Sequence, residues 1–222
     1  MVTGIDRAKL VQALRLYLVT DEASLRGKTL TDVVVAAAQG GVTCVQLREK
    51  TLSTRDFVAK AVALKKALDP FGIPLVINDR MDVALACESE GVHLGQSDMP
   101  PDLARRMLPN NVFIGWSVEN IAHLDHSKAL QAAGCVDYLG VSPVFYTATK
   151  SDIAKPWGLD GLRHMRQVST LPLVAIGGVN AGNAAELLSA GADGLAVVSA
   201  ICSAADPTLA ARELCQAMEG TL

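Results

Sequence analysis

The sequence predicts an α/β fold in which eight parallel strands, each followed by a helix, close into a (β/α)8 TIM barrel. Short apolar runs rich in β-branched residues alternate with helix-like segments along the whole chain. The length of 222 residues lies within the range that α/β barrels occupy as one unit. We therefore expect one domain, residues 1–222. An open doubly wound sheet is the alternative, but such a sheet usually has fewer strands.

The stretch Val42–Lys50 shows why the strands are expected to open into a cleft. It begins as an apolar, β-branched run and ends with two cations. A strand that is buried on both faces is apolar almost throughout, so Gln46, Arg48 and Lys50 indicate that this strand emerges into a polar site at its carboxyl end.

The other predicted strands are compact apolar runs that likewise close on polar or small residues. In chain order they are Leu16–Thr20, Pro74–Asp79, Gly91–Gly95, Val112–Ser117, Tyr138–Ser142, Leu173–Gly178 and Leu195–Ser199. A long polar loop, residues 143–157, follows the sixth strand.

Helix boundaries follow from capping and breaking residues. Thr31 and Asp32 are expected to cap a helix over Val33–Gln39, and Ser53 with Thr54 is expected to cap the next helix, which ends near Leu68. A Pro-Pro pair at 100–101 opens another helix. The remaining predicted helices are a short amphipathic one within Met1–Leu16, then Arg80–Cys87, Val118–Ala133, Leu159–Val168, Ala181–Ala190 and Pro207–Met218.

A glycine precedes several strands, in the phrases that contain Gly41, Gly91, Gly134 and Gly191. We interpret these as structural glycines that end a helix and turn the chain into the next strand, at the face of the barrel that serves stability.

Composition and charge exclude several classes of partner. The net charge is −3, the isoelectric point is about 5.8, and no block of Lys or Arg recurs, so the sequence predicts no nucleic-acid partner and no membrane partner. The five cysteines are far apart and lack metal-type spacing, which favours buried thiols in a reducing compartment. The N-terminal segment lacks the apolar core of a signal peptide, and we expect a cytoplasmic protein.

In a TIM barrel the working residues come from the carboxyl ends of the strands and the loops that follow. Those positions are polar in this chain: Gln46, Arg48, Lys50, Asn78, Asp79, Gln96, Asp98, Ser117, Thr147, Thr149, Lys150, Gly177, Gly178, Val198 and Ser199.

Two loops suggest a phosphate site. Gly177 and Gly178 follow the seventh strand, and Val198 and Ser199 lead into a helical turn after the eighth, where many barrels bind a phosphate with backbone amides. The alternative, that the paired glycines only turn a corner, is less favoured because both loops carry the signal.

Asp79 and Asp98 follow neighbouring strands, so their carboxylates are expected to converge. Two carboxylates with few other ligands suit Mg²⁺, which keeps waters and binds substrate phosphates. The alternative is that each aspartate caps the helix that follows it. Three cations, Arg48, Lys50 and Lys150, favour the metal interpretation, because they suit a second and more highly charged phosphate group; a merely solvated edge is the lesser alternative.

The histidines are expected to have structural or surface roles, and the large aromatics are considered with them. His93 lies within a strand and is expected to be a hydrogen-bonded core residue rather than a metal ligand, while His123, His126 and His164 fall on helices at the surface. Trp157 and Tyr146 are expected either to roof the site or to pack.

From about Tyr17 to the last helix the chain resembles the thiamine phosphate synthase family. The shared phrases are ordered and specific: Gln46-Leu47-Arg48-Glu49-Lys50, Ile77-Asn78-Asp79, Val92-His93-Leu94-Gly95-Gln96 followed by Asp98, Pro143-Val144-Phe145 with Thr147-Ala148-Thr149-Lys150, and Ile176-Gly177-Gly178.

The resemblance implies a transferase of thiamine biosynthesis that joins 4-amino-2-methyl-5-(hydroxymethyl)pyrimidine diphosphate to a thiazole monophosphate, plain or carboxylated, and releases pyrophosphate. It also implies the site residues. The pyrimidine diphosphate is held by Gln46, Arg48, Lys50, Asn78, Ser117 and Lys150, the thiazole phosphate by Thr147, Thr149, Gly178, Val198 and Ser199, and Mg²⁺ by Asp79 and Asp98. Arg48, Lys50, Ser117 and Lys150 carry the catalytic roles, the partners are these small molecules, and assembly into a homo-oligomer is left open.

This chain departs from the family pattern at Ser142 and Tyr146, where Gly and Pro are usual, and the intervening loop is expected to be mobile without ligand. Three alternatives remain. They are a thiazole tautomerase of the same fold, which lacks the metal carboxylates and uses a histidine where this chain has Ser117-Val118-Glu119; a lyase that forms a Schiff base on Lys150; and a non-catalytic barrel that senses phosphate.

Overall fold

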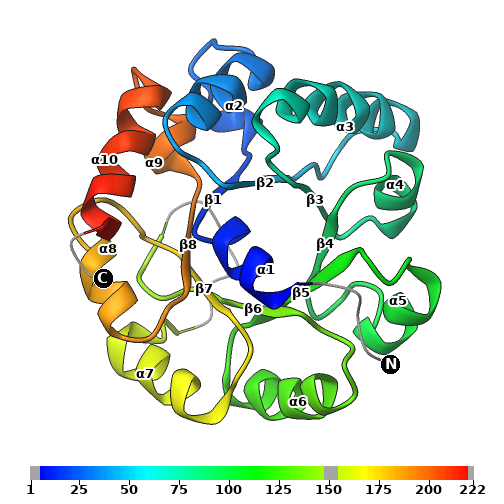
Figure 1. The fold of residues 1–222 in the computed structure, drawn as a ribbon, viewed down its shortest axis with the longest axis vertical. Helices are drawn as coiled ribbons and strands as arrows, with labels where there is room; N and C mark the ends of the chain where they lie inside the picture. The colour runs from blue at the N-terminus through cyan, green and yellow to red at the C-terminus, as the bar shows by residue number, and fades with distance from the viewer. Residues whose placement is uncertain (1–5, 148–154, 220–222) are drawn as a thin grey trace.

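The computed structural model describes residues 6–147 and 155–219, and they form the predicted barrel. Eight parallel strands pair in sequence order and close on themselves, β1 against β8, with the helices arranged outside them (Figure 1). The strands are β1 (Leu16–Val19), β2 (Cys44–Leu47), β3 (Leu75–Asn78), β4 (Gly91–Leu94), β5 (Phe113–Val118), β6 (Tyr138–Val141), β7 (Leu173–Ile176) and β8 (Gly194–Val197).

The helices that follow the strands lie where the sequence predicts them, with shifts at the ends. They are α2 (Leu30–Gln39), α3 (Thr54–Leu68), α4 (Met81–Ala86), α5 (Pro101–Met107), α6 (Ile121–Ala132), α7 (Gly158–Val168), α8 (Ala184–Ser189), α9 (Ser199–Cys202) and α10 (Pro207–Glu219), with short 3₁₀ turns at η1 (Glu22–Ser24) and η2 (Asp69–Phe71).

Three predicted helix starts are displaced. The helix predicted from Ala181 begins at Ala184, and capping explains the other two. Thr29, not Thr31, caps α2, because its side chain accepts the Asp32 N–H at 3.1 Å. The helix predicted from Val118 begins at Ile121, after Asn120 accepts the His123 N–H at 3.0 Å. In both cases a polar residue that satisfies a backbone donor decides the boundary.

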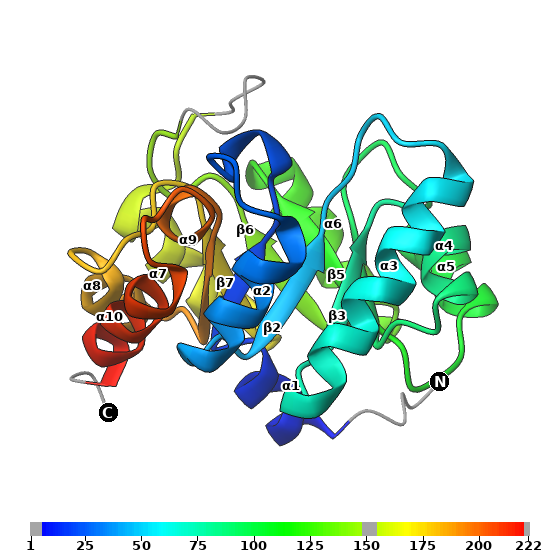
Figure 2. The same ribbon diagram turned by 90° about the horizontal axis from the view of Figure 1, so that it is seen from above.

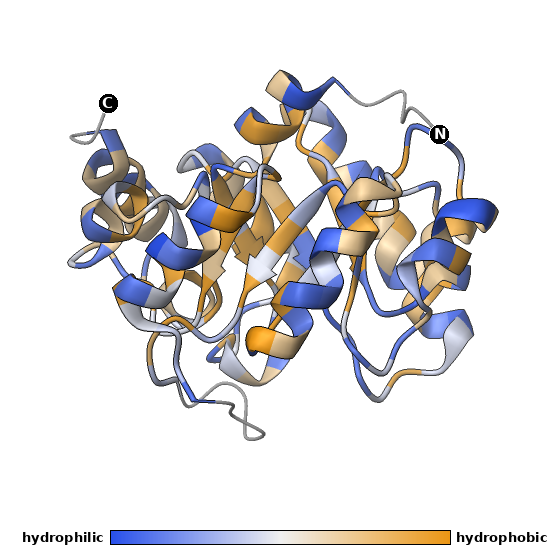
Figure 3. Ribbon diagram, turned by 90° about the horizontal axis from the view of Figure 1, so that it is seen from below, coloured by the Kyte–Doolittle hydropathy of each residue, from blue (hydrophilic) through white to orange (hydrophobic). Residues whose placement is uncertain are grey.

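The interior holds two apolar layers. Alternate side chains of each strand point inward or outward, so Tyr17 and Val19 belong to the inner layer, while Leu16 and Leu18 pack under the helices. The short helix α1 (Arg7–Ala13) lies across the amino-terminal end of the barrel, opposite the loops that follow the strands (Figures 1 and 2), and its Leu10 joins the inner layer. Figure 3 shows the apolar strands enclosed by helices with polar outer faces.

The interpretation of Gly91 as a helix-ending glycine is wrong. Gly91 is the first residue of β4, and Glu88 takes the left-handed turn before it, with a φ of 52°. A Cβ on Gly91 would collide with the Phe113 ring, so this glycine makes room inside the barrel. Gly41 and Gly134 do turn the chain at positive φ, 107° and 64°, as predicted.

Acidic residues tie neighbouring strands together at the amino-terminal end. Asp137, just before β6, accepts the N–H of Ile114 on β5 at 2.7 Å and pairs with Arg105 of α5, with all three groups buried. The same arrangement of an acid, a strand N–H and a helix cation recurs for Asp193, Leu173 and Arg166, and for Glu90, Leu75 and Lys65. Each acidic side chain therefore links the strand that follows it to the neighbouring strand, and links both to a helix on the outside of the barrel.

We predict that Asp137→Ala lowers the free energy of unfolding by roughly 3–5 kcal/mol, because it leaves Arg105 buried without its charge partner. The matched control is Asp125→Ala, which breaks the exposed Lys128–Asp125 pair and is expected to cost about 1 kcal/mol or less. Urea denaturation followed by circular dichroism measures both. Equal losses in the two variants would contradict the role given to Asp137.

Candidate active site

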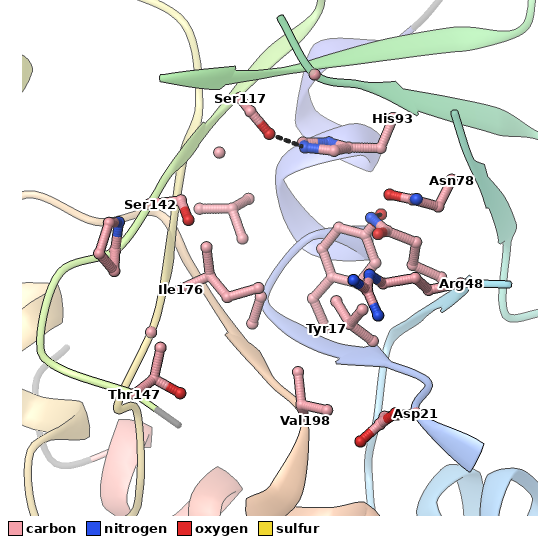
Figure 4. Close-up of a pocket in the computed structure, with 18 of the residues that line it drawn as sticks. Tyr17, Asp21, Arg48, Asn78, His93, Ser117, Ser142, Thr147, Ile176 and Val198 are labelled. Carbon is pink, nitrogen blue, oxygen red and sulfur yellow. Dashed lines mark hydrogen bonds between the residues drawn. The ribbon is translucent and has the colours of Figure 1, made fainter. Parts of the chain in front are cut away.

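A pocket of about 560 Å³ opens at the carboxyl ends of the strands and reaches down into the barrel (Figure 4). It is lined by every predicted site residue that the structure describes: Gln46, Arg48, Lys50, Asn78, Asp79, Asp98, Ser117, Thr147, Gly178, Val198 and Ser199. Thr149 and Lys150, and the predicted mobility of their loop, lie outside the described residues. The polar ends of separate strands thus meet in one cavity.

The end of β2 delivers the cations. Arg48 reaches from β2 into the pocket beside Tyr17 (Figure 4), and its backbone N–H donates to Thr20 Oγ1 at 3.0 Å. Between the two cations, Glu49 turns outward and accepts from Lys60 of α3 at 2.5 Å. This ion pair has a carboxylate only 8% exposed, so it holds the segment that carries Arg48 and Lys50.

Asp79 and Asp98 both line the pocket and their carboxylates lie close together, which is the predicted convergence. Lys50 Nζ donates to Asp79 Oδ2 at 2.5 Å, and Asp98 Oδ2 accepts the Gly95 N–H at 2.7 Å. Burial raises the pKa of the Asp98 carboxyl, and the neighbouring Asp79 carboxylate raises it further. Two carboxylates are therefore held close together, against their mutual repulsion.

The alternative roles of these aspartates as helix caps are not observed. The residue that caps α4 is Arg80, with no side-chain cap bond, and α5 likewise begins at Pro100 without one. Asp79 instead adopts a left-handed conformation, with a φ of 63°, which is unusual for a residue other than glycine. The chain carries backbone strain at a position where its carboxylate enters the pocket.

The carboxylate pair fits Mg²⁺ better than a metal that needs a full set of protein ligands. Within residues 6–147 and 155–219, no group of three or more His, Cys, Asp or Glu side chains is placed to hold a metal. Mg²⁺ accepts one or two carboxylates and completes its shell with water and phosphate oxygens. Lys50 balances part of the charge of this pair.

The glycines after β7 bring main chain to the opposite side of the pocket. Gly177 and Gly178 have φ values of 103° and 68°, and a Cβ on Gly178 would lie 2.8 Å from Phe145 Cβ and 2.9 Å from Tyr146 O. Side chains are therefore excluded from this bend. Figure 4 places Thr147 and Ser142 on this side, away from Asn78 and Arg48, so the pocket has two polar walls.

Of the two expectations for Trp157 and Tyr146, that they roof the site or that they pack, the structure does not support the first. Trp157 packs, and its Nε1–H donates to Val118 O at 3.2 Å, while Tyr146 is 80% exposed; neither lines the pocket. His93 is hydrogen-bonded within the barrel, as predicted, but it also lines the cavity, together with Tyr17 and Tyr138, which sequence reasoning missed.

The cysteines support the prediction of buried thiols. All five are free, four of them are buried, and Cys215 is half-buried. Burial raises the pKa of the Cys202 and Cys87 thiols, which keeps them protonated and poorly reactive. No helix among the described residues is both long and apolar enough to cross a membrane.

Comparison with known proteins places the chain in a family. A family profile described as thiamine monophosphate synthase matches residues 16–201. The chain is 65% identical to a thiamine-phosphate synthase of Albidiferax ferrireducens, over 94% of both chains, and 52% identical to one of Chloroflexus aurantiacus, over 90% of both. A solved thiamine phosphate pyrophosphorylase from Pyrococcus furiosus superposes with a TM-score of 0.86 at 37% identity, covering 96% of this chain and 99% of the other. The chain therefore belongs to the thiamine monophosphate synthase family of thiamine-biosynthetic enzymes.

Proposed function

We propose that the pocket joins 4-amino-2-methyl-5-(hydroxymethyl)pyrimidine diphosphate to 4-methyl-5-(2-hydroxyethyl)thiazole phosphate and releases thiamine monophosphate and pyrophosphate; with the carboxylated form of the thiazole phosphate, CO2 is released as well. The observation that carries the proposal is the pair of polar walls. Cations and carboxylates gather on one side, and a glycine bend without side chains lies on the other. Such a cavity suits one metal-bound diphosphate and one monophosphate.

The cationic wall is assigned to the pyrimidine diphosphate. Arg48 offers a planar fork of donors for phosphate oxygens, and Lys50 offers a compact charge. Asn78, only 7% exposed, can donate and accept at the deeper part of this wall, and Gln46 and Ser117 line the same pocket. The family motif adds Lys150 to this set, and the thiazole phosphate is assigned to Thr147, Thr149, Gly178, Val198 and Ser199.

Asp79 and Asp98 are assigned to Mg²⁺. When bound there, the ion would neutralise and polarise the oxygens of the pyrophosphate group. Lys50, which pairs with Asp79 at 2.5 Å, would then be available to the phosphates. This assignment explains why the protein keeps two carboxylates together although their proximity raises the pKa of one of them.

The chemistry assigned by family resemblance is dissociative. The bond from the methylene carbon to the pyrophosphate oxygen breaks first, and the oxygen leaves with the electron pair. The aminopyrimidine ring shares the resulting positive charge until the thiazole nitrogen donates its lone pair to the methylene carbon. Arg48 and Lys50 stabilise the departing anion, and the pocket walls align the two rings. The reaction therefore needs no nucleophile paired with a general base.

Two features weigh against the alternatives. A tautomerase of this fold would lack the metal carboxylates, whereas Asp79 and Asp98 are both present and face the cavity. Regulation without catalysis would not require a carboxylate held at a strained backbone position. A Schiff-base lyase is distinguished by borohydride trapping, which is expected to label no lysine of this protein.

The proposed reaction is tested by incubating the purified protein with both substrates and Mg²⁺ and measuring thiamine monophosphate and pyrophosphate by chromatography and mass spectrometry. We expect equal amounts of the two products, and loss of both when a chelator removes the divalent ion. Failure to form thiamine monophosphate from either thiazole substrate would overturn the proposal.

We predict that Asp79→Asn and Asp98→Asn each reduce the Mg²⁺-dependent rate by about 100-fold or more, because a metal ligand with full charge is lost. Asp102→Asn, on the exposed side of α5, is the control and is expected to retain the rate. Initial rates over a range of Mg²⁺ concentrations measure the effect. Normal Mg²⁺ dependence in both site variants would remove the carboxylate pair from the mechanism.

Asp98→Asn is also predicted to stabilise the protein in the absence of metal at neutral pH. A raised carboxyl pKa means that the folded state holds the proton more tightly than the unfolded state does. The ionised Asp98 carboxylate therefore destabilises the folded state. This loss of stability begins as the pH rises through the unfolded-state pKa and is complete above the folded-state pKa. Thermal unfolding at pH 7 in chelator should show a higher Tm than the parent protein, and no difference once the pH falls below both pKa values.

Gly178→Ala is predicted to raise the KM for the thiazole phosphate by about tenfold or more, with a smaller effect on the KM for the pyrimidine diphosphate. A Cβ there would meet Phe145 and Tyr146 and distort the bend. Gly72→Ala is the matched control: its φ is also positive, 64°, but nothing lies within 4 Å of the added Cβ, and it is far from the pocket lining. Equal changes in both KM values for Gly178→Ala would contradict the assignment of this wall.

A further inference from the structure

A continuous chain of hydrogen bonds crosses the inside of the barrel beneath the pocket. Gln46 Nε2 donates to Tyr17 Oη at 2.9 Å, and Tyr17 Oη lies 3.0 Å from Tyr138 Oη. Tyr138 Oη lies 2.9 Å from His93 Nδ1, and His93 Nε2 lies 2.9 Å from Ser117 Oγ, the last link being visible in Figure 4. The chain therefore joins two predicted substrate-binding residues, Gln46 and Ser117, through three residues that have no assigned role.

Two glycines create the space that this chain occupies. A Cβ on Gly115 of β5 would fall on the Tyr138 hydroxyl and on His93 Nδ1, the two ends of one link. A Cβ on Gly140 of β6 would lie 2.9 Å from His93 Cε1. Any larger residue at either position would displace the histidine ring, so the barrel wall is shaped around this polar chain rather than around an apolar core.

The number of protons along the chain restricts its direction. Each tyrosine and serine hydroxyl carries a single proton, and a neutral histidine carries one proton on one ring nitrogen. Burial raises the pKa of both tyrosines well above the ordinary value, so both keep their protons. If each link contains one donated proton and both tyrosine hydroxyls donate within the chain, all the links must run in the same direction, either from Gln46 to Ser117 or the reverse.

We propose that the chain runs from Gln46 to Ser117, which places the His93 proton on Nε2 and leaves the Ser117 hydroxyl proton free to donate into the pocket. Gln46 donates to Tyr17, Tyr17 to Tyr138, Tyr138 to His93 Nδ1, and His93 Nε2–H to Ser117 Oγ. The side-chain amide oxygen of Gln46 then remains available to accept a hydrogen bond from a ligand.

This direction matches the substrate chemistry, and here the inference rests on the proposed function. Phosphate oxygens beside Ser117 accept hydrogen bonds and do not donate them, so a serine that has already given its proton to His93 would face them with a lone pair. The exocyclic amine of an aminopyrimidine donates, and the Gln46 oxygen accepts. The three residues between them, Tyr17, Tyr138 and His93, are therefore positioning residues. They make Ser117 a hydrogen-bond donor to the phosphate end of the substrate and leave the Gln46 oxygen as an acceptor at the aminopyrimidine end.

The direct test is the position of the His93 proton, read from ¹⁵N chemical shifts in NMR spectra of the ligand-free protein, with the ring assigned through the Val92 and Leu94 backbone. We expect the proton on Nε2. A proton on Nδ1, on both nitrogens, or shared evenly between them overturns the proposal. The measurement needs no substrate and no turnover, so its outcome is separate from that of the thiamine monophosphate assay.

Tyr138→Phe tests whether the links are coupled, because it removes one oxygen from the middle of the chain. We expect a substantial population of His93 protonated on Nδ1 in this variant, since Nδ1 no longer accepts a hydrogen bond from the Tyr138 hydroxyl. Ser127→Ala removes another buried hydroxyl, which donates to Leu124 O on α6, and it is expected to leave His93 unchanged. An unaltered histidine in Tyr138→Phe would show that the links are independent.

Kinetics provide a second readout that a purely structural role would not produce. Tyr17→Phe and Tyr138→Phe are each expected to raise the KM for the pyrimidine diphosphate by about tenfold, with the thiazole KM little changed. The double variant should be no worse than either single variant, because one break already removes the direction of the chain. Fully multiplicative effects, or equal changes in both KM values, would count against the positioning role.

Discussion

Closure of eight short parallel strands into one ring is the constraint on which the rest of the structure depends. Seven of the strands have four residues and β5 has six, so few side chains separate the two ends of the barrel. Because the strands are parallel, every carboxyl end faces the same mouth. The amino-terminal end carries the acid-to-strand bonds of Asp137 and its counterparts, which hold the ring together away from the pocket. Stability and chemistry are thereby separated onto opposite ends.

The barrel interior is less apolar than its strands suggest. Tyr17, Tyr138 and His93 occupy the inner layer with apolar neighbours, and their polar atoms are paired with one another. A buried polar group is costly unless it is hydrogen-bonded, so a connected chain is the form in which such groups are tolerated at the pocket floor. The mouth above carries charge instead, with Lys50 and the carboxylates of Asp79 and Asp98 partly neutralising each other. Neutral polar groups thus lie deep, and charges lie near solvent.

The order of strands and most of the cavity wall could be predicted from sequence because the signals are local. An apolar run that ends in Arg48 and Lys50, or in Asn78 and Asp79, identifies a strand and the face that it opens onto. The cavity floor could not be predicted in the same way. In a strand that is apolar on both faces, nothing local distinguishes an inward residue such as Tyr17 from an outward one such as Leu18. Packing between strands decides which alternate residues of a strand point inward. Gly91 is an example, since its role depends on the ring of Phe113 on the next strand.

The carboxylate pair is central to the proposed function, since the proposed metal site, its charge balance and the proposed departure of pyrophosphate all depend on it. The most direct measurement is a crystal structure of the protein with Mn²⁺ in place of Mg²⁺ and a non-reacting analogue of the pyrimidine diphosphate, with the metal located by anomalous scattering. We expect one peak in contact with both Asp79 and Asp98 and with a phosphate oxygen, and Lys50 turned from Asp79 towards the phosphates. A diphosphate bound in the pocket with no metal between the two carboxylates would contradict this expectation.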